Sequence, residues 1–205
     1  MAIKYLKKAI KTPSTDDSKT RTAVQNILND IQKRREERIK EITKKFDNYD
    51  GDIIVSKEKI EEAIKKVDQK TKDDVKFAHE RIRKFAEYQL KSMNNEFEVE
   101  LSKGLFAGQR LIPINTAGCY IPGGRYAHIS SATMAITPAK VAGVKTIICA
   151  SPPKDANGAH PGIIYAANLC GADVILNLGG IAACLLYTSD AADEGLGVDL
   201  GGRRI

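Results

Sequence analysis

The sequence predicts an α/β protein in which an N-terminal helical segment is followed by an incomplete parallel sheet with helices on both faces. Two observations lead to this prediction. In roughly the first ninety residues, apolar positions recur at steps of three and four, as on amphipathic helices. From Ala117 onward the charge thins out, and short apolar runs alternate with small-residue helical stretches. Strands that are each followed by a helix are typical of a parallel sheet covered on both sides.

Three helices are expected in the N-terminal part. The first runs from about Lys19 to Phe46 and stops at the Asn-Tyr-Asp-Gly of residues 48–51. After an extended piece at 53–55, Ser56 is a good N-cap for the second helix. The third begins near Thr71, where Asp74 three residues later resembles a capping box. The expected buried residues are Val24, Ile27, Leu28, Ile31, Ile39 and Ile42, then Ile60, Ala63, Ile64 and Val67, then Val75, Ala78, Ile82 and Phe85.

After Asn94-Asn95 the apolar period changes to two. Phe97, Val99 and Leu101 alternate with glutamates, which predicts a half-buried strand.

The region from Ala117 has the order β-α-β-α-β. We expect strands at 117–121, 146–150 and 174–178, and helices near 131–144 and 162–169. Right-handed crossovers would then give an incomplete Rossmann-like sheet, whose ligands bind where loops leave the carboxyl ends of the strands. Two such loops stand out: Pro122-Gly123-Gly124 after the first strand and Gly179-Gly180 after the third. A sheet that stops after three strands is also expected to expose an apolar edge.

The first glycine loop is a candidate nucleotide-binding loop. Glycine permits positive φ and lets a phosphate approach main-chain N–H groups at a helix N-terminus. The loop matches neither the Gly-x-Gly-x-x-Gly nor the Gly-x-x-x-x-Gly-Lys pattern, so a plain tight turn is the competing interpretation. Tyr120, at the preceding strand end, is a candidate for stacking on a ligand ring, with core packing as the alternative. The candidate cofactor-binding residues are therefore Tyr120, Gly123 and Gly124.

Composition narrows the function classes. The net charge of +6 comes mainly from helices on which both signs are mixed, a pattern of solvated ion-paired faces and not of a nucleic-acid-binding surface. No apolar run has the length of a signal peptide or a membrane span, so a cytoplasmic location is expected. The four cysteines are far apart, and with three histidines a complete zinc site is hard to assemble.

Residues 114–129 read Ile-Asn-Thr-Ala-Gly-Cys-Tyr-Ile-Pro-Gly-Gly-Arg-Tyr-Ala-His-Ile. This run resembles the signature stretch of the histidinol dehydrogenase family. Segments 137–144, 150–153, 169–173 and 178–180 keep the family's order and spacing, and Lys45-Phe46-Asp47 is also family-like. The resemblance covers about residues 20–180. The Arg125–His128 variant and the stretch from Val75 to His79 look closer to the sulfopropanediol dehydrogenase branch.

The resemblance implies a cytoplasmic homodimer that uses zinc and NAD. Such an enzyme oxidises a primary alcohol, here L-histidinol or dihydroxypropanesulfonate, through an aldehyde to a carboxylate with two NAD in succession. The family's zinc ligands and its Glu-His pair lie in the second half of a chain about twice as long. No catalytic or metal-binding residue can therefore be mapped onto this chain, which is expected to be inactive alone. Tyr120 corresponds to the family's cofactor-contacting tyrosine, with Gly123 and Gly124 as neighbouring candidates.

The sequence departs from the family pattern in two places. Gly179-Gly180 is followed by Ile181-Ala182 where the family often has Gln, which puts a second cofactor contact in doubt. The family's usual Gly-Asp in the first helical region is replaced near Arg35-Glu36 by charged residues.

Three regions are expected. Residues 1–116 form the helix-rich part of the first domain, and residues 117–183 form the incomplete Rossmann-like cofactor-binding domain. Residues 184–205 resemble a translated sequencing adapter and are interpreted as a non-native tail.

Two other functions compete with a dehydrogenase. One is a nucleotide-binding module without chemistry, which predicts NAD binding by this chain. The other is an interaction protein built on the basic helices, which predicts a protein partner and no nucleotide affinity.

Overall fold

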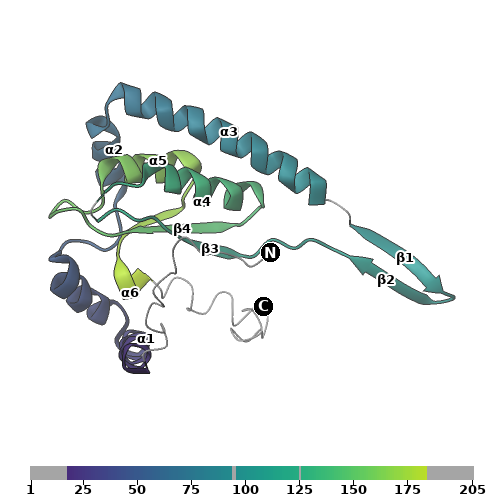
Figure 1. The fold of residues 1–205 in the computed structure, drawn as a ribbon, viewed down its shortest axis with the longest axis horizontal. Coiled ribbons are helices and arrows are strands. Elements are labelled where there is room, and N and C mark those ends of the chain that lie inside the picture. Colours follow the sequence, from purple (N-terminus) through teal and green to yellow (C-terminus); the bar gives the residue numbers. More distant parts are fainter. Residues whose placement is uncertain (1–17, 94–95, 125, 184–205) are drawn as a thin grey trace, which may run out of the picture.

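The computed structural model describes residues 18–93, 96–124 and 126–183 of the chain, and the expected tail at 184–205 lies outside them. Helices precede a parallel sheet with its own helices, so the predicted fold class is confirmed (Figure 1). The elements are α1 (Ser18–Asp47), α2 (Lys57–Lys66), α3 (Gln69–Met93), β1 (Phe97–Ser102), β2 (Leu105–Gln109), β3 (Thr116–Tyr120), α4 (Ile129–Val141), β4 (Thr146–Ser151), α5 (Pro161–Cys170), β5 (Val174–Asn177) and α6 (Gly180–Ala183).

The central sheet has the order β3-β4-β5, and both strand pairs are parallel. The helices α4 and α5 cover one face, with α2 and α3 packed against them, while α1 and α6 lie on the other face (Figure 1). The strands alternate accordingly: Ile147 and Cys149 belong to the larger core, and Ala150 belongs to the core shared with α1. The expectation of helices on both faces is therefore confirmed.

One of the two sheet edges, the edge beyond β5, is partly covered, whereas β3 has no further strand beside it among the described residues. The extended segment 53–55 runs antiparallel beside β5, with a bridge between Ile54 and Leu176. The Val55 amide donates to the Ile175 carbonyl at 2.9 Å, and the Asn177 amide donates to the Ile53 carbonyl at 2.7 Å. These bonds satisfy backbone groups that an open edge would expose. The N-terminal helical segment is thus joined to the sheet by main-chain hydrogen bonds.

The side chain of Asn177 is a buried link between distant parts of the chain. Its Nδ2 donates to Tyr49 Oη at 3.0 Å and to the Asp52 carbonyl at 2.9 Å. Its Oδ1 accepts from the Ala159 amide at 2.8 Å. Gly158, next to it, has φ of 99°, and an added Cβ would meet the Asn177 amide group at 2.6 Å. One amide group therefore fixes the α1–α2 connection, the loop before α5 and the end of β5 together.

The helix α1 is kinked at Arg35, so the prediction of one continuous helix is wrong. Arg35 has φ of 49° and ψ of −128°, which lies in the left-handed half of backbone space that favours glycine. This is the place where the resemblance expects Gly-Asp. The kink turns the second half of α1 against the first, and Ile31 and Ile42 enter the same core.

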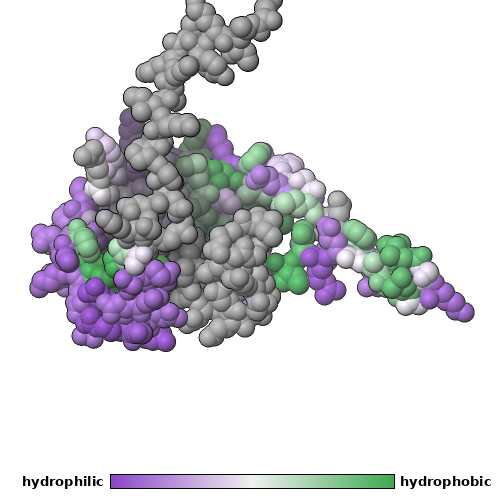
Figure 2. All heavy atoms as spheres, turned by 60° about the horizontal axis from the view of Figure 1, so that its bottom comes forward, coloured by the Kyte–Doolittle hydropathy of each residue, from purple (hydrophilic) through white to green (hydrophobic). Residues whose placement is uncertain are grey.

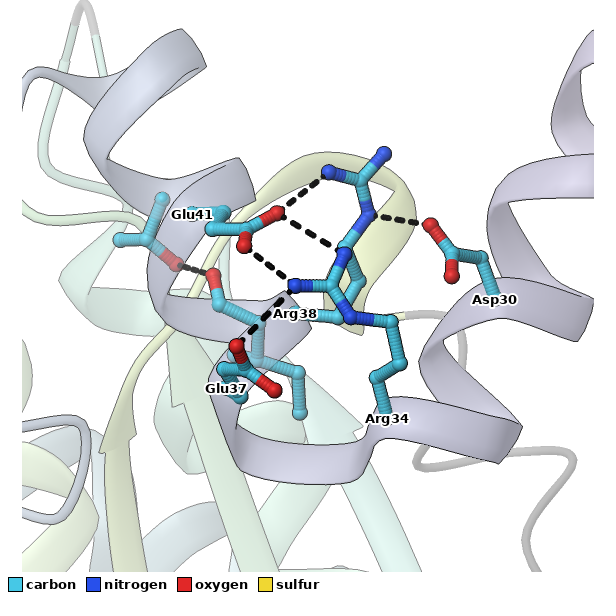
Figure 3. Close-up of polar contacts among 7 residues, drawn as sticks. Asp30, Arg34, Glu37, Arg38 and Glu41 are labelled. Carbon is cyan, nitrogen blue, oxygen red and sulfur yellow. Dashed lines mark hydrogen bonds and ion pairs between the residues drawn. The ribbon is translucent and has the colours of Figure 1, made fainter.

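An ion-pair network spans the kink (Figure 3). Arg34 bonds Glu41, seven residues further on, although a straight helix would separate them by about 10 Å of rise. Arg38 Nη1 lies 2.7 Å from Glu41 Oε2. Arg38 Nε lies 2.7 Å from Asp30 Oδ2, an ion pair without hydrogen-bond alignment. Hydrogen bonds from Arg34, then from Arg38, hold the pKa of Glu41 below its ordinary value. Because these groups are exposed, the network contributes little to the free energy of unfolding. Its main effect is to orient the two halves of α1 relative to each other.

The caps of α2 and α3 are only partly as predicted. Ser56 caps α2, with its Oγ accepting from the Lys59 amide at 3.3 Å. At α3 the capping side chain is Asp68, whose Oδ1 accepts from the Thr71 amide at 2.9 Å, so the expected pairing of Thr71 with Asp74 is wrong. A carboxylate at this position binds the free N–H groups of the first turn directly.

The core-facing side of α3 also differs at its C-terminal end. Val75 is buried as expected, whereas Phe85 is 66 % exposed and Ala86 is buried in its place. The small Ala86 side chain allows close helix packing, and the aromatic ring points away from the described residues.

The β1–β2 hairpin projects from the body (Figures 1 and 2). The prediction of a half-buried strand at 97–101 is wrong, because every residue of β1 is exposed. Apolar side chains on β1 and β2 are between 45 and 64 % exposed, and nothing in the described part of the chain covers them: Phe97, Val99, Leu101, Leu105 and Phe106. A two-stranded hairpin is marginally stable alone, so this surface is built to pack against further protein.

Within the described residues, no helix is both long and apolar enough to cross a membrane.

Replacing Asn177 by alanine is expected to lower the free energy of unfolding by about 3 kcal/mol, because the Ala159 amide and the Asp52 carbonyl lose a buried partner. Urea unfolding followed by circular dichroism measures the change. The exposed Asn168→Ala is the matched control and should stay within about 0.5 kcal/mol of the parent. Equal effects of the two substitutions would contradict the role of Asn177.

Replacing Arg35 by glycine is expected to raise the free energy of unfolding by about 1 kcal/mol, because glycine adopts the kink conformation without steric strain. The same substitution at Lys33, an exposed helical position, should lower it by about 1 kcal/mol. Thermal unfolding of the two variants separates strain relief from the general cost of glycine. A loss of stability in Arg35→Gly would show that the kink is not strained.

Candidate functional site

The carboxyl ends of β3, β4 and β5 meet at one edge of the sheet. Pro122-Gly123-Gly124 leaves β3, Pro152-Pro153 leaves β4, and Gly179-Gly180 follows β5. Ligands of open parallel sheets bind at this edge. The two glycine loops singled out by the sequence are therefore on the same side of the molecule.

Gly123 is required by close packing and not by its backbone conformation. A Cβ atom on Gly123 would lie 2.6 Å from Ser151 Oγ and 2.9 Å from Ile163 Cδ1, and its φ is not positive. Gly124 has nothing within 4 Å of the corresponding position, so it faces open space. The two glycines thus have different roles: the first lets the loop lie on the end of β4, and the second leaves the backbone open to approach.

Ser151, the last residue of β4, has a buried hydroxyl group without a hydrogen-bond partner. Its side chain is fully buried under Gly123, and its Oγ meets no donor or acceptor among the described residues. An unsatisfied buried hydroxyl costs free energy, and such groups concentrate where a ligand or a movement satisfies them. The choice between a nucleotide-binding loop and a plain tight turn stays a prediction, and the unsatisfied Ser151 hydroxyl lies directly under the loop.

Pro152 connects the two glycine loops. A Cβ on Gly179 would lie 2.6 Å from Pro152 Cβ, and a Cβ on Gly123 would lie 3.7 Å from the Pro152 carbonyl oxygen. Gly180 has φ of 54°, so only the second loop uses the positive φ that glycine permits. The loops after β3 and β5 are therefore packed together through Pro152, with Gly123, Pro152 and Gly179 buried and Gly124 and Gly180 exposed.

Tyr120 is the last residue of β3 and is 36 % exposed. Its ring is accordingly not a core side chain, although the flanking Cys119 and Ile121 are buried. It lies at the strand end from which the first glycine loop leaves, with one side open to a ligand. The helix α4 starts at Ile129 after that loop, and the His128 amide at its N-cap donates to the Pro122 carbonyl at 3.2 Å.

A cavity of about 230 Å³ lies beside the second glycine loop. Both halves of the kinked α1 contribute to it, since Ile27 comes from the first half and Ile42 from the second. The remaining lining residues are Phe46, Asp47, Gly179 and Gly180. The kink at Arg35 therefore shapes a mostly apolar cavity at the carboxyl edge of the sheet.

Asp47 is the charged residue of this cavity. Its Oδ1 lies 3.6 Å from the position of a Cβ on Gly179, and its side chain is half-buried. Burial raises the pKa of the Asp47 carboxyl above its ordinary value. In the part of the chain that the structure describes, this carboxylate makes no hydrogen bond or ion pair, so its acceptor capacity is available to a ligand.

The histidines do not gather at this edge. His79 Nδ1 lies 3.0 Å from Thr137 Oγ1 and 3.4 Å from Cys170 Sγ, between α3, α4 and α5, and burial lowers its pKa. His160 caps α5 by accepting from the Gly162 amide at 3.1 Å, so it marks the start of that helix. Among residues 18–93, 96–124 and 126–183, no three His, Cys, Asp or Glu side chains group as metal ligands.

The described cysteines are buried thiols, as expected. Cys119, Cys149 and Cys170 are buried, and burial raises the pKa of the Cys149 thiol to about 12. A thiol with so high a pKa is a poor nucleophile at neutral pH.

The sequence reasoning missed Asp47 and Ser151 as members of this site. Ser151 ends an apolar run, and a serine after a strand carries little signal by itself. Asp47 is 132 residues from Gly179, and its approach depends on the kink at Arg35, which no local pattern indicated. Arg125, in the first glycine loop, lies outside the described residues.

Comparison with known families gives a match over most of the chain. A family model described as histidinol dehydrogenase matches residues 10–188, so the match begins before and ends after the expected range of 20–180.

Individual relatives agree with the family model. A histidinol dehydrogenase homolog of Pelagibacter ubique is 66 % identical over 189 residues, which are 92 % of this chain and 44 % of that protein. The sulfopropanediol 3-dehydrogenase of Ruegeria pomeroyi is 48 % identical over 181 residues, 88 % of this chain and 41 % of that protein. The crystal structure of histidinol dehydrogenase from Elizabethkingia anophelis superposes with a TM-score of 0.76 at 30 % identity, over 87 % of this chain and 41 % of that one. The chain thus spans about two fifths of these relatives' lengths.

Replacing Gly123 by alanine is expected to lower the free energy of unfolding by about 1 to 3 kcal/mol, because the added methyl group overlaps Ser151 Oγ and Ile163 Cδ1. Gly124→Ala is the matched control one residue away, and it should change stability by no more than about 0.5 kcal/mol. Urea unfolding midpoints measure both. Equal destabilisation by the two variants would refute the close packing of the loop on β4.

Proposed function

The chain belongs to the histidinol dehydrogenase family, and from this membership we propose that it is the cofactor-binding part of an NAD-dependent alcohol dehydrogenase. The observation that carries the proposal is that the two glycine loops pack together through Pro152 at the carboxyl edge of the sheet, with Gly124 and Gly180 exposed and an unsatisfied Ser151 hydroxyl under Gly123. Membership of the family supports the type of reaction. The arrangement of the glycine loops supports a cofactor site at the carboxyl edge of the sheet.

The described residues fit a dinucleotide. The Gly124 backbone is open to approach, and α4 begins five residues later without a side-chain cap at its N-terminus, so a pyrophosphate would bind between them. The half-exposed ring of Tyr120 would pack against a ring or ribose of the cofactor. We therefore propose Tyr120, Gly123 and Gly124 as cofactor-binding residues, with Gly123 acting through its packing on Ser151.

When bound, NAD supplies the hydride acceptor. Oxidation of a primary alcohol to an aldehyde removes one hydride and one proton. Oxidation of the aldehyde to a carboxylate adds a water molecule, removes a second hydride and releases two further protons. The net reaction therefore consumes two NAD for each alcohol. This chain's part is to hold and orient the dinucleotide at the strand ends.

The described residues do not supply the rest of the chemistry. They contain no cluster of metal ligands and no acid–base pair at the cofactor edge, so no step is assigned to zinc here. We propose that the zinc site and the proton-transferring groups belong to the part of the longer protein that this chain does not span. The chain alone is accordingly expected to be inactive.

The domain limits follow the same reasoning. We propose residues 1–116 as part of the first domain and 117–183 as the incomplete cofactor-binding domain, and we assign no function to 184–205.

The proposed substrate is a small primary alcohol, either L-histidinol or dihydroxypropanesulfonate. The 48 % identity to a sulfopropanediol 3-dehydrogenase favours the sulfonate.

The proposed location is the cytoplasm, without a nucleic-acid or membrane partner. The uncovered apolar surface of the β1–β2 hairpin supports a homodimer of the longer protein, in which such a surface would be buried.

The test is to clone the uninterrupted gene from the source DNA and to express it with zinc. NADH formation is then followed by its absorbance with each of the two alcohols. We expect about two NADH for each alcohol consumed, because the reaction passes through the aldehyde.

Turnover of dihydroxypropanesulfonate but not of L-histidinol would establish the sulfopropanediol branch, and the reverse would overturn it. Absence of turnover with both alcohols, together with NAD binding by the chain, would replace the dehydrogenase by a nucleotide-binding module without chemistry. A protein partner without NAD affinity would favour the interaction protein instead.

A further inference from the structure

We propose that Asp47 binds the hydroxyl groups of the adenosine ribose and thereby selects NAD over a dinucleotide that carries a 2′-phosphate. The inference rests on the proposed function, because it assigns a specificity-determining residue to the same cofactor edge. Asp47 comes from the end of α1 and not from the sheet, so it is not part of the glycine loops themselves.

The position of Asp47 suits this role. Its Oδ1 lies 3.6 Å from the Cβ position of Gly179, and Gly179 packs on Pro152, which in turn faces Gly123. Gly123, Pro152 and Gly179 are buried, whereas Gly124 and Gly180 are exposed, so a dinucleotide whose pyrophosphate lies over Gly124 would cross above this packed layer to the cavity beside Gly180. Dinucleotide-binding folds use a carboxylate to accept hydrogen bonds from the ribose hydroxyls.

The lining of the cavity suits a nucleoside chemically. Its volume of about 230 Å³ is bounded by the apolar side chains of Ile27, Ile42 and Phe46, with one carboxylate at the Gly179 side. Ligand sites of this kind combine apolar walls with a few polar groups that fix orientation. The apolar walls would hold the adenine ring, and the carboxylate would meet the two hydroxyl groups.

The charges around the cavity disfavour a 2′-phosphate. Lys44 pairs with Asp50 at 3.8 Å, and the Lys45 ammonium lies 5.4 Å from the centre of the Phe46 ring. Neither cation pairs with Asp47 in the described structure. Burial without a compensating cation also raises the pKa of the Asp47 carboxyl. A second phosphate placed here would face an unneutralised carboxylate, and like charges at close range repel.

The experiment measures binding of NAD, NADP and 2′-deoxy-NAD (lacking the adenosine 2′-hydroxyl) to the full chain by isothermal titration calorimetry. The variants are Asp47→Asn and Asp47→Ala. Asp50→Asn is the matched control, because Asp50 is an exposed acid three residues away whose partner is Lys44. Circular dichroism melting curves verify that each variant is folded.

The expected affinities follow from the hydrogen bond between the ribose hydroxyl and the Asp47 carboxylate. Loss of such a charge-assisted bond raises Kd by about 10- to 100-fold. The parent chain should bind NAD at least about tenfold more tightly than NADP and than 2′-deoxy-NAD. In Asp47→Asn and Asp47→Ala, the NAD to NADP ratio should fall by about tenfold or more, and Asp47→Ala should no longer distinguish NAD from 2′-deoxy-NAD. Asp50→Asn should keep the parent's ratios.

Each failure has its own meaning. If the parent binds NAD but its preference for NAD over NADP survives in both Asp47 variants, the role of Asp47 is overturned and the proposed function stands. If the parent binds NAD and 2′-deoxy-NAD equally, the ribose contact is overturned even where a variant fails to fold. If the parent binds none of the three dinucleotides, both the inference and the proposed cofactor site fail.

Discussion

The buried amide of Asn177 is the interaction on which the arrangement of the site depends. It hydrogen bonds Tyr49 Oη and the Asp52 carbonyl on one side and the Ala159 amide on the other. Tyr49 follows the end of α1 by two residues, so this bond fixes where α1 ends relative to the end of β5. Because the second glycine loop begins just after Asn177, the approach of Asp47 to Gly179 is a direct consequence. A side chain within the sheet thus positions the end of α1 through a bond to Tyr49, 128 residues earlier in the chain.

A second constraint is the missing Cβ atom at Gly123 and at Gly179. Each of these glycines lies within 2.6 Å of a neighbour, measured from the position that a Cβ would take. The two close approaches bring the three strand ends onto one surface, with Pro152 between the loops. They also bury the Ser151 hydroxyl without a partner, which weakens the folded state. Proteins retain such local costs mainly where a functional site requires the geometry.

The sequence predicted the sheet well because its strands and helices are short, apolar and separated by glycine and proline. All three strands and both crossover helices lie within three residues of their expected bounds. The site was predicted only in part. Tyr120 ends strand 116–120, and Gly123 and Gly124 lie in the loop that follows it, so all three can be located from the local pattern, although their contact with a cofactor stays a prediction.

What the sequence could not show are contacts between distant segments. The conformation of Arg35, the approach of Asp47 to Gly179 and the exposure of Phe85 all depend on packing between elements far apart in the chain. The hairpin was misjudged for a related reason. Alternation in β1 identifies an apolar face but not what covers it, and no described residue covers it.

These features divide the proposed enzyme into a part that holds the cofactor and a part that acts on the substrate. The strand ends, the glycine loops and the cavity beside Asp47 are built from residues of this chain and are shaped without a metal. The hairpin and the outer side of α3 present apolar side chains to which nothing in the described structure binds. In the proposed homodimer the second copy would bury that surface, while the reacting groups would come from the part of the longer protein that this chain does not span. On the proposed function, dinucleotide binding and alcohol oxidation belong to different parts of the longer protein, and NAD binding by this chain stays a prediction.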